Sequence, residues 1–305
     1  MEMVLIPNNP YFKQVQLLVS VLPVLEEYPV FALKGGTAIN LFVRDLPRLS
    51  VDIDLAYEPV TNRDESLTDI NENLSQMAEK LESQGIRVQK NDVNKTTRLT
   101  VSNGEAQIKI ETSPVLRGSV HSTQKMTVTP KVEETFGYAE VRTLSFEDLY
   151  AGKICAALDR QHPRDLYDVK ALLDNEGISE KLKDTFLVYL MSHGRPMHEL
   201  LNPNFKDITD IYTNEFENMT TERVKLAELL EARSQLVQQI QQALTEADKA
   251  FLLSVKKRTA DWSQFVYPEV ANLPAIKWKI HNLAQMPEDA HKKATNRLEL
   301  FLQSI

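Results

Sequence analysis

Two aspartates stand two positions apart in a short apolar segment, a spacing that suits metal binding. Asp52 and Asp54 alternate there with Val51, Ile53 and Leu55. Side chains two apart in a β-strand point to the same face, so the Cα atoms of the two aspartates should lie about 6.5–7 Å apart. Carboxylates that face the same way repel unless cations such as Mg²⁺ lie between them, as in enzymes of phosphoryl transfer. A solvated strand face explains the pair equally well, and both interpretations stay open on this pattern alone.

A glycine pair precedes the aspartates and suits the binding of a phosphate group. Gly35 and Gly36 stand between a short β-type run and a helical pattern, and Thr37 follows them. Glycines at such a point let the backbone approach an anion, and the first turn of the helix offers N–H groups and a favourable dipole. Turn geometry and capping explain most isolated glycine pairs. Followed by a helix and then by Ser-x-Asp-x-Asp, the pair predicts a phosphate site beside a metal site.

A third carboxylate comes from a later alternating segment, AQIKIETS. Ile108 and Ile110 share one face of this expected strand, and Lys109 and Glu111 share the other. If the strand lies beside the one that carries the aspartates, Glu111 is a candidate metal ligand or base. A charged cross-strand pair on an open face is the simpler alternative.

A second group of charged residues lies further along the chain, in Lys153, Arg160, Arg164, Asp165 and Asp168. The first two are seven positions apart on one helix, and His162-Pro163 ends that helix before the other three begin the next. Cations and carboxylates from adjacent helix ends suit a triphosphate and a catalytic base. Arginine–aspartate pairs at helical spacing are also common on solvated surfaces, which is the alternative for this group.

The composition bounds the class of protein. The chain has 305 residues with no long apolar run and no signal-peptide pattern, so we expect a cytoplasmic protein without a membrane segment. Its one cysteine, Cys155, excludes an internal disulfide and a cysteine-built zinc site, and its helical context predicts a buried side chain. No two histidines have the spacing found in zinc proteases, so a histidine-built metal site is not expected. The net charge of −8 argues against coating of nucleic acid through bulk charge but allows a local basic groove.

Hydrophobic periodicity predicts the elements that must position these residues. In chain order they are a helix over 11–29, a strand over 30–36, a helix over 37–46, a strand over 50–57, a helix over 64–85 and a hairpin over 96–114. Asn103-Gly104 marks the hairpin turn. The remainder is almost wholly helical, and residues 220–258 form one long helix or a helical hairpin. The predicted fold is α+β, with a mixed sheet in an α/β domain over 1–140 and a helical domain over 141–305.

The motifs coincide with those of a known family. LKGGTAINL, RLSVDIDL and LSFEDLYAGKICAALDRQHPRDLYDV together resemble the AbiEii/AbiGii, or MenT-like, nucleotidyltransferase toxins of bacterial toxin–antitoxin pairs. These toxins belong to the DNA polymerase β-like nucleotidyltransferase superfamily. The resemblance is close over residues 30–60 and 140–175 and looser over the helical half, where WKIHNLAQM is also similar. It implies a polymerase β-like core with a mixed sheet, followed by a largely helical domain.

Carried over residue by residue, the resemblance implies a site. Nucleotide binding is implied for Gly35, Gly36, Thr37, Ser50, Lys153 and Arg164; catalysis for Asp52, Asp54, Lys153, Asp165 and Asp168; and metal binding for Asp52, Asp54 and Glu111. The implied metal is Mg²⁺ or Mn²⁺, and the substrate is an NTP whose monophosphate passes to an acceptor with release of pyrophosphate. The implied acceptor is the 3′ end of tRNA, and the implied partner is a winged-helix antitoxin of the AbiEi kind.

Two other functions stay open at this point. A catalytically silent module would keep the fold to bind nucleotide or antitoxin, although buried charges such as Lys153 are costly in a protein that does not use them. A small-molecule nucleotidyltransferase of the aminoglycoside type would need an acidic pocket for a cationic acceptor, whereas an RNA acceptor needs a basic groove. The candidate cations for that groove are Arg160, Arg164, Lys256, Lys257, Arg258, Lys292 and Lys293.

Overall fold

The computed structural model describes residues 9–93 and 96–305, which pack as two compact units. Unit 1 holds the chain up to Leu149 together with Thr213–Val224, and unit 2 holds Tyr150–Tyr212 and Lys225–Ile305. The division lies inside a helix, and a segment from the second half of the sequence belongs to the first unit. The predicted division into domains over 1–140 and 141–305 stays a prediction.

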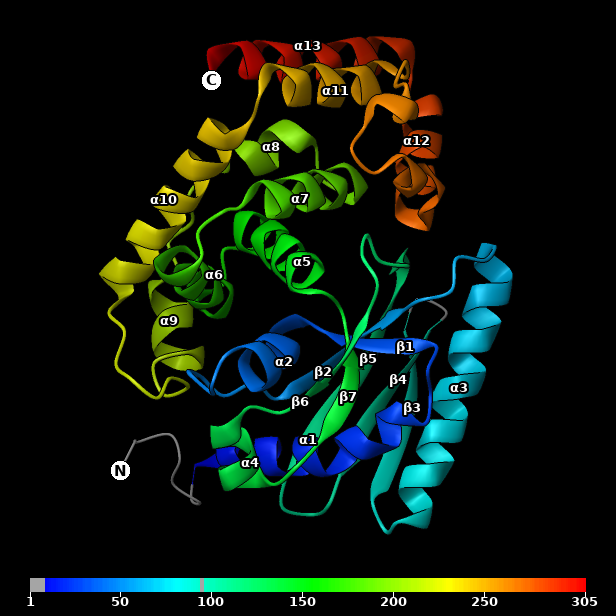
Figure 1. Cartoon of the computed structure of the whole chain (residues 1–305), viewed down its shortest axis with the longest axis vertical. Helices are drawn as coiled ribbons and strands as arrows, with labels where there is room; N and C mark the ends of the chain where they lie inside the picture. Colours follow the sequence, from blue (N-terminus) through cyan, green and yellow to red (C-terminus); the bar gives the residue numbers. More distant parts are fainter. Residues whose placement is uncertain (1–8, 94–95) are drawn as a thin grey trace. The chain divides into compact units, whose positions relative to one another are not determined.

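Unit 1 is built on a mixed sheet, which within the described residues has seven strands in the order β3-β4-β5-β2-β1-β7-β6 (Figure 1). The strands are β1 (Phe31–Lys34), β2 (Asp52–Tyr57), β3 (Arg87–Val93), β4 (Thr96–Ser102), β5 (Gln107–Arg117), β6 (Gln124–Thr127) and β7 (Glu140–Thr143). Strand β2 pairs antiparallel with β1 and parallel with β5, and β1 pairs parallel with β7. The α+β class and the mixed sheet are confirmed, with β2 in the middle of the sheet.

Strands β4 and β5 form the hairpin that Asn103-Gly104 predicts, with Ser102 opposite Gln107. Gly104 has a φ of +92°, and the Asn103 side chain accepts hydrogen bonds from the backbone N–H groups of Glu105 and Ala106. Both features are typical of residues that favour turns. The hairpin places β5 next to β2, as the interpretation of Glu111 requires.

Helices α1 (Pro10–Glu26) and α3 (Arg63–Ser83) contact each other and the strands (Figure 1). The predicted helix over 64–85 is confirmed, because α3 buries a stripe at three- and four-residue spacing: Leu67, Ile70, Leu74, Met77, Ala78 and Leu81. Asn62 caps its first turn by accepting a hydrogen bond from the Glu65 N–H, and Gly85 follows its last turn with a φ of +83°. The short helix α4 (Pro130–Phe136) also contacts α1.

The segment after β1 departs from the predicted helix over 37–46. Helix α2 (Gly35–Ala38) starts at the glycine pair and widens at once into the π-helix η1 (Ile39–Val43). The next connection, Pro47–Leu49, is paired with the segment Thr213–Val224: the Leu49 N–H donates to the Met219 carbonyl, and the Thr221 N–H donates to the Pro47 carbonyl. These bonds anchor the residues that lead into β2.

Unit 2 is helical, as predicted. Its helices are α5 (Phe146–Asp159, which begins in unit 1), α6 (Pro163–Asn175), α7 (Glu180–Ser192), α8 (Met197–Leu201), α9 (Thr209–Glu215, which ends in unit 1), α10 (Leu226–Ala243), α11 (Glu246–Lys257), α12 (Pro274–Ala284) and α13 (Glu288–Ser304). Helix α6 packs on α10, α12 on α7, and α13 on both α8 and α11. Cys155 is buried, as expected.

The periodic segment 220–258 contains two helices rather than one, α10 and α11. Thr245 caps α11 by accepting a hydrogen bond from the Asp248 N–H, and the Asp248 carboxylate accepts one from the Thr245 N–H. This capping box interrupts the helical hydrogen bonding between the two helices. Within residues 9–93 and 96–305, no helix is long and apolar enough to cross a lipid bilayer.

Candidate active site

The two aspartates of β2 lie as the alternation predicts. Asp52 and Asp54 are partly exposed, whereas Ile53 and Leu55 between and after them are buried. In register, Asp54 lies opposite Lys34 of β1. The strand therefore presents both carboxylates on one face while its other face contributes to the core.

Gly35 is required by the position of Asp54. A Cβ atom at residue 35 would lie 2.6 Å from Asp54 Oδ2, and the backbone there has a φ of +75°. L-amino acids with a side chain avoid both conditions, because left-handed backbone is strained and real Cβ contacts are longer. The glycine thus allows a carboxylate to lie against the first turn of α2.

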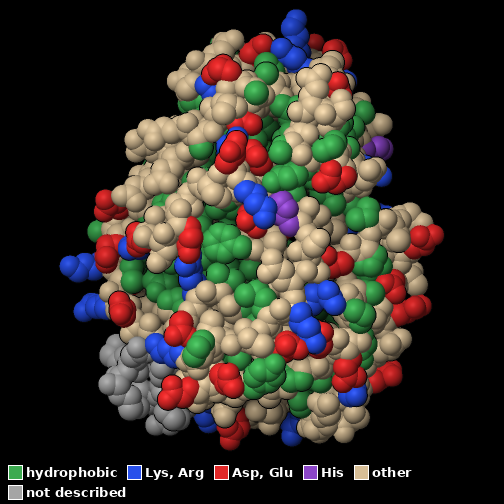
Figure 2. Space-filling model, in the orientation of Figure 1, with side chains coloured by type: hydrophobic (Ala, Val, Ile, Leu, Met, Phe, Trp, Pro, Cys, Tyr) green, Lys and Arg blue, Asp and Glu red, His purple; other side chains and the backbone are tan. Residues whose placement is uncertain are grey.

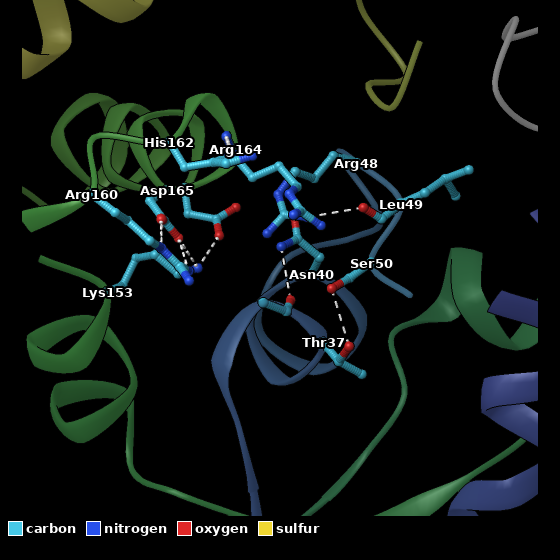
Figure 3. A network of polar contacts seen from close by, with 12 residues as sticks. Thr37, Asn40, Arg48, Leu49, Ser50, Lys153, Arg160, His162, Arg164 and Asp165 are labelled. Atoms are coloured by element: carbon cyan, nitrogen blue, oxygen red, sulfur yellow. Dashed lines mark hydrogen bonds and ion pairs between the residues drawn. The ribbon is translucent and has the colours of Figure 1, made fainter. Parts of the chain in front are cut away.

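Gly36 lies against a buried arginine, Arg48, that was not among the predicted site residues. A Cβ atom at residue 36 would lie 2.6 Å from Arg48 Nη2 and 3.0 Å from Ser50 Oγ. Arg48 is 2% exposed, and its Nη1 donates a hydrogen bond to the Leu49 carbonyl at 2.9 Å (Figure 3). The second glycine therefore leaves room for a guanidinium and a hydroxyl beside the helix start, both of which can bind an anion.

Side-chain hydrogen bonds of Thr37 and Asn40 stabilise the segment that starts at the glycine pair (Figure 3). The buried Thr37 hydroxyl donates to the Asp52 carbonyl and lies 3.1 Å from Ser50 Oγ. The Asn40 side chain donates to the Gly36 carbonyl at 2.9 Å. Thr37 and Ser50 thereby position β2 against α2, and Asn40, which the sequence analysis did not single out, fixes the glycine pair. A lone polar residue four positions after a glycine in an apolar helix was the available signal.

Glu111 lies next to Asp54, in the register that the hypothesis of a third carboxylate requires. Strand β5 places Glu111 beside Asp54 and Lys109 beside Asp52. Glu111 Oε2, however, forms an ion pair with Arg98 Nη2 at 2.8 Å. Among residues 9–93 and 96–305, no group of three or more His, Cys, Asp or Glu side chains is arranged to hold a metal ion. Glu111 as the third ligand stays a prediction.

Three charged residues of α5 and α6 form a buried cluster within unit 2. Lys153 Nζ lies 2.9 Å from Asp165 Oδ1 and 2.9 Å from Asp168 Oδ2, and Arg160 also binds Asp165. The side chain of Lys153 is 6% exposed and those of the two aspartates are 1% exposed. A solvated surface pair is thereby excluded for Lys153, Asp165 and Asp168, whereas the side chain of Arg160 is 64% exposed. We call this group the lysine–aspartate cluster.

The local sequence explains how the cluster forms. Pro163 begins α6, and His162 caps it by accepting a hydrogen bond from the Arg164 N–H at 3.1 Å. This places Asp165 in the first turn of α6. Burial alone would raise the pKa of Asp165, but the Lys153 ammonium and the Arg160 guanidinium outweigh it and hold that pKa well below its ordinary value. Asp165 is therefore a carboxylate that balances buried positive charge.

The lysines and arginines of the two basic runs proposed for RNA binding, 256–258 and 292–293, differ in exposure and in bonding. Lys256 is buried, Lys257 pairs with Glu299 at 2.9 Å, and Arg258 donates to the Met286 carbonyl. Lys292 and Lys293 of α13 are exposed. The last two are thus the better candidates for phosphate contacts among these runs.

A family model described as nucleotidyl transferase AbiEii toxin, type IV TA system, matches residues 16–281. No curated protein matches the sequence. A solved structure, the nucleotidyltransferase toxin MenT4 from Mycobacterium tuberculosis H37Rv, superposes with a TM-score of 0.61 at 13% identity, covering 96% of this chain and 94% of that chain. At this identity the likeness to MenT4 concerns the fold.

Proposed function

The chain belongs to the AbiEii family of nucleotidyl transferase toxins, and on that premise we propose that it transfers a nucleoside monophosphate from an NTP to RNA. Nucleotidyltransferase activity and an antitoxin partner follow from membership of this toxin–antitoxin family. We further propose the 3′ end of tRNA as the acceptor and a winged-helix protein of the AbiEi kind as the antitoxin.

One observation carries the proposal. Polar groups lie where a Cβ would be at both glycines at the start of α2: the Asp54 carboxylate at Gly35, and the Arg48 guanidinium and the Ser50 hydroxyl at Gly36. A carboxylate next to a cation and backbone N–H groups suits a ligand that carries both phosphates and a divalent ion. A simple turn would not need these two side chains in contact with its glycines.

Asp52 and Asp54 would hold the divalent ion. Their donor atoms are the carboxylate oxygens that Mg²⁺ and Mn²⁺ prefer, and one or two carboxylates plus substrate phosphates are the usual set for Mg²⁺. Because Arg98 occupies an oxygen of Glu111, the phosphates of the NTP are the expected source of further ligands. When bound, the ion would neutralise charge on the phosphates.

The chain's own residues then have separable roles. The N–H groups of α2 would bind phosphate oxygens, the buried Arg48 would add positive charge beside them, and Thr37 would keep the Asp52 backbone in place. The acceptor hydroxyl oxygen bonds to the α-phosphorus. The bond between the α-phosphorus and the oxygen that bridges to the β-phosphate breaks, and pyrophosphate leaves. For Lys153, Arg164, Asp165 and Asp168 we retain the proposed roles in nucleotide binding and catalysis. Lys153 would do so while balanced by two carboxylates.

The test is transfer of label from NTP to RNA. The protein is incubated with Mg²⁺, tRNA and each NTP labelled at its α-phosphate, and the RNA is resolved on a denaturing gel. We expect label on tRNA, and loss of that label when the tRNA 3′ end is first oxidised with periodate. Label that persists on oxidised tRNA would place the acceptor elsewhere. NTP binding without any transfer would support the silent module, and label on a small cationic acceptor would support the small-molecule enzyme.

A further inference from the structure

Helix α12 carries two stacked aromatic rings on its exposed face. Trp278 is 52% exposed, and its ring lies 5.6 Å from that of His281 with 17° between the ring planes. The two residues are three positions apart and so share one side of the helix. The other tryptophan of the chain, Trp262, instead contacts the rings of Phe251 and Phe265. An exposed tryptophan with one ring already stacked beside it is an unusual use of a large apolar side chain.

The opposite side of α12 is fixed, so the stacked rings have a rigid support. Ala275, Ile276 and Leu283 are buried. Lys279 Nζ donates hydrogen bonds to the carbonyls of His193 at 2.6 Å and Arg195 at 3.0 Å, at the end of α7. Binding on the exposed face would therefore cost little conformational entropy in the helix.

The charge of this helix favours an anionic ligand. Helix α12 has the sequence PAIKWKIHNLA, with Lys277 beside Trp278 and no acidic residue, in a chain whose net charge is −8. Burial, and after it repulsion from Lys256, lower the pKa of Lys279 to about 8. Cations thus lie near one another here. Over the face drawn in Figure 2, Lys and Arg side chains are mixed with acidic ones.

We propose that Trp278 and His281 form a stacking platform for an unpaired base of the acceptor RNA, with Lys277 contacting a neighbouring phosphate. The inference rests on the proposed RNA acceptor. Aromatic faces bind bases of any identity, and cations between them bind the backbone. A protein partner could also use an exposed tryptophan, but stacked flat rings on a helix that has lysines and no acidic residue match the chemistry of RNA more closely.

The first experiment reads Trp278 directly. The chain has two tryptophans, so Trp278 is the one that remains in the full-length Trp262→Phe variant. The variant is titrated with a single-stranded RNA of about ten nucleotides, a typical site size, and with an abasic ribose-phosphate oligomer of the same length. We expect saturable quenching of Trp278 fluorescence by the RNA and none by the abasic oligomer. RNA binding seen in a mobility shift without any quenching would overturn the platform.

The second experiment measures its contribution. Loss of one base stack corresponds to about a 5- to 150-fold weaker interaction, so Trp278→Ala should raise the KM for tRNA within that range, and Trp278→Phe should restore much of it. Leu300→Ala, at a side chain that is 68% exposed on α13, is the matched control and should leave the KM unchanged. Equal KM values for wild type and Trp278→Ala, or loss of antitoxin binding with RNA binding intact, would refute the inference. Failure of wild type to label any RNA would instead refute the proposed acceptor, while the titration still tests the platform.

Discussion

Asp52 and Asp54 differ in their surroundings although both face the same side of β2. Asp54 lies between Lys34 and Glu111 in the sheet and contacts Gly35, whereas Asp52 lies beside Lys109 and carries the backbone carbonyl that Thr37 binds. Replacing either carboxylate removes a candidate metal ligand. Asp52 is the better position for a test, because its side chain does not lie against Gly35 as that of Asp54 does.

We predict that Asp52→Ala abolishes transfer while the protein stays folded. Loss of charge stabilisation worth several kcal/mol corresponds to about a thousand-fold fall in rate. Lys109→Ala, at the register neighbour of Asp52, is the matched control and should retain nearly full activity. Rates of NMP transfer decide between them. An Asp52→Ala protein that labels RNA at the wild-type rate would remove this residue from the metal site.

A second residue-scale prediction concerns Glu58, which directly follows β2. Burial, then the nearby Asp148, raise the pKa of Glu58 to about 7, although a hydrogen bond from Ser119 and the charge of Arg142 oppose the rise. Glu58 Oε1 is buried without a hydrogen-bond partner among the described residues. The folded protein thus binds this proton more tightly than the unfolded chain, so its contribution to stability is full below about pH 4.5 and is lost as the pH rises through about 7.

We expect Glu58→Gln, which mimics the protonated side chain, to become more stable relative to wild type as the pH rises from 5 to 8. The quantity to measure is the difference in urea midpoint between the two proteins at each pH, because other titrating groups cancel in that difference. A difference that does not change with pH would mean that Glu58 is ionised throughout.

At the scale of elements, the β1–α2 turn depends on glycine for two separable reasons. Gly35 has a left-handed φ of +75° and a neighbouring carboxylate, whereas Gly85 has a φ of +83° and open space where a Cβ would be. The backbone cost of alanine is about 1–2 kcal/mol at either site. Gly35→Ala should therefore lose stability and activity together, while Gly85→Ala should lose a similar amount of stability and keep its activity. Urea unfolding and NMP transfer, measured on both variants, separate the two effects. Full activity in Gly35→Ala would show that Asp54 can move without consequence.

The lysine–aspartate cluster joins α5 to α6, so it should contribute to stability as well as to function. Lys153→Ala leaves Asp165 with Arg160 and removes the ammonium that pairs with the buried Asp168, and we expect a loss of about 3–5 kcal/mol. Lys170→Ala, which breaks a more exposed pair with Asp174 on α6, should cost less than about 1 kcal/mol. Urea unfolding tests both. If Lys153→Ala is as stable as Lys170→Ala, the cluster is not a structural one, and any loss of activity belongs to Lys153 directly.

Elements with strong periodicity could be predicted from the sequence, and short polar strands could not. Helix α3 and the β4–β5 hairpin have clear stripes and a turn signal. Strands β3, β6 and β7 were missed because RVQKNDV, QKMT and EVRT have few apolar residues to alternate. The first two lie at the edges of the sheet, where charged side chains are common. The break before α11 was readable in Thr245-x-x-Asp248, a capping box.

Individual residues of the candidate site could be predicted from the sequence, but their contacts with one another could not. The sequence indicated the glycines and aspartates, but the contact of Asp54 with Gly35 depends on the antiparallel register of β1 and β2. The role of Arg48 was missed because the loop around it is held by Thr213–Val224, a segment far away in the sequence. Long-range packing of this kind leaves no local pattern.

At the scale of the whole molecule, binding of RNA has to overcome a net charge of −8. Each contact to a phosphate needs a cation or an N–H donor, so affinity should depend on local groups rather than on the overall field. Among the basic runs, Lys256 is buried and Lys257 forms an ion pair with Glu299. Lys292 and Lys293 are exposed on α13 and are the candidates that salt dependence can test.

We predict that tRNA affinity falls steeply between low and moderate salt, whereas NTP affinity changes less. Removing one phosphate contact should reduce the slope of log K against log salt by about 0.7–0.9. The double variant Lys292→Ala/Lys293→Ala should therefore flatten the slope by up to twice that amount, and Lys257→Ala, whose side chain is paired with Glu299, should leave it nearly unchanged. Filter binding over a salt series measures both slopes. A steep slope that the double variant does not alter would move the phosphate contacts to Arg160 and Arg164, and tRNA affinity that is indifferent to salt would favour the small-molecule acceptor instead.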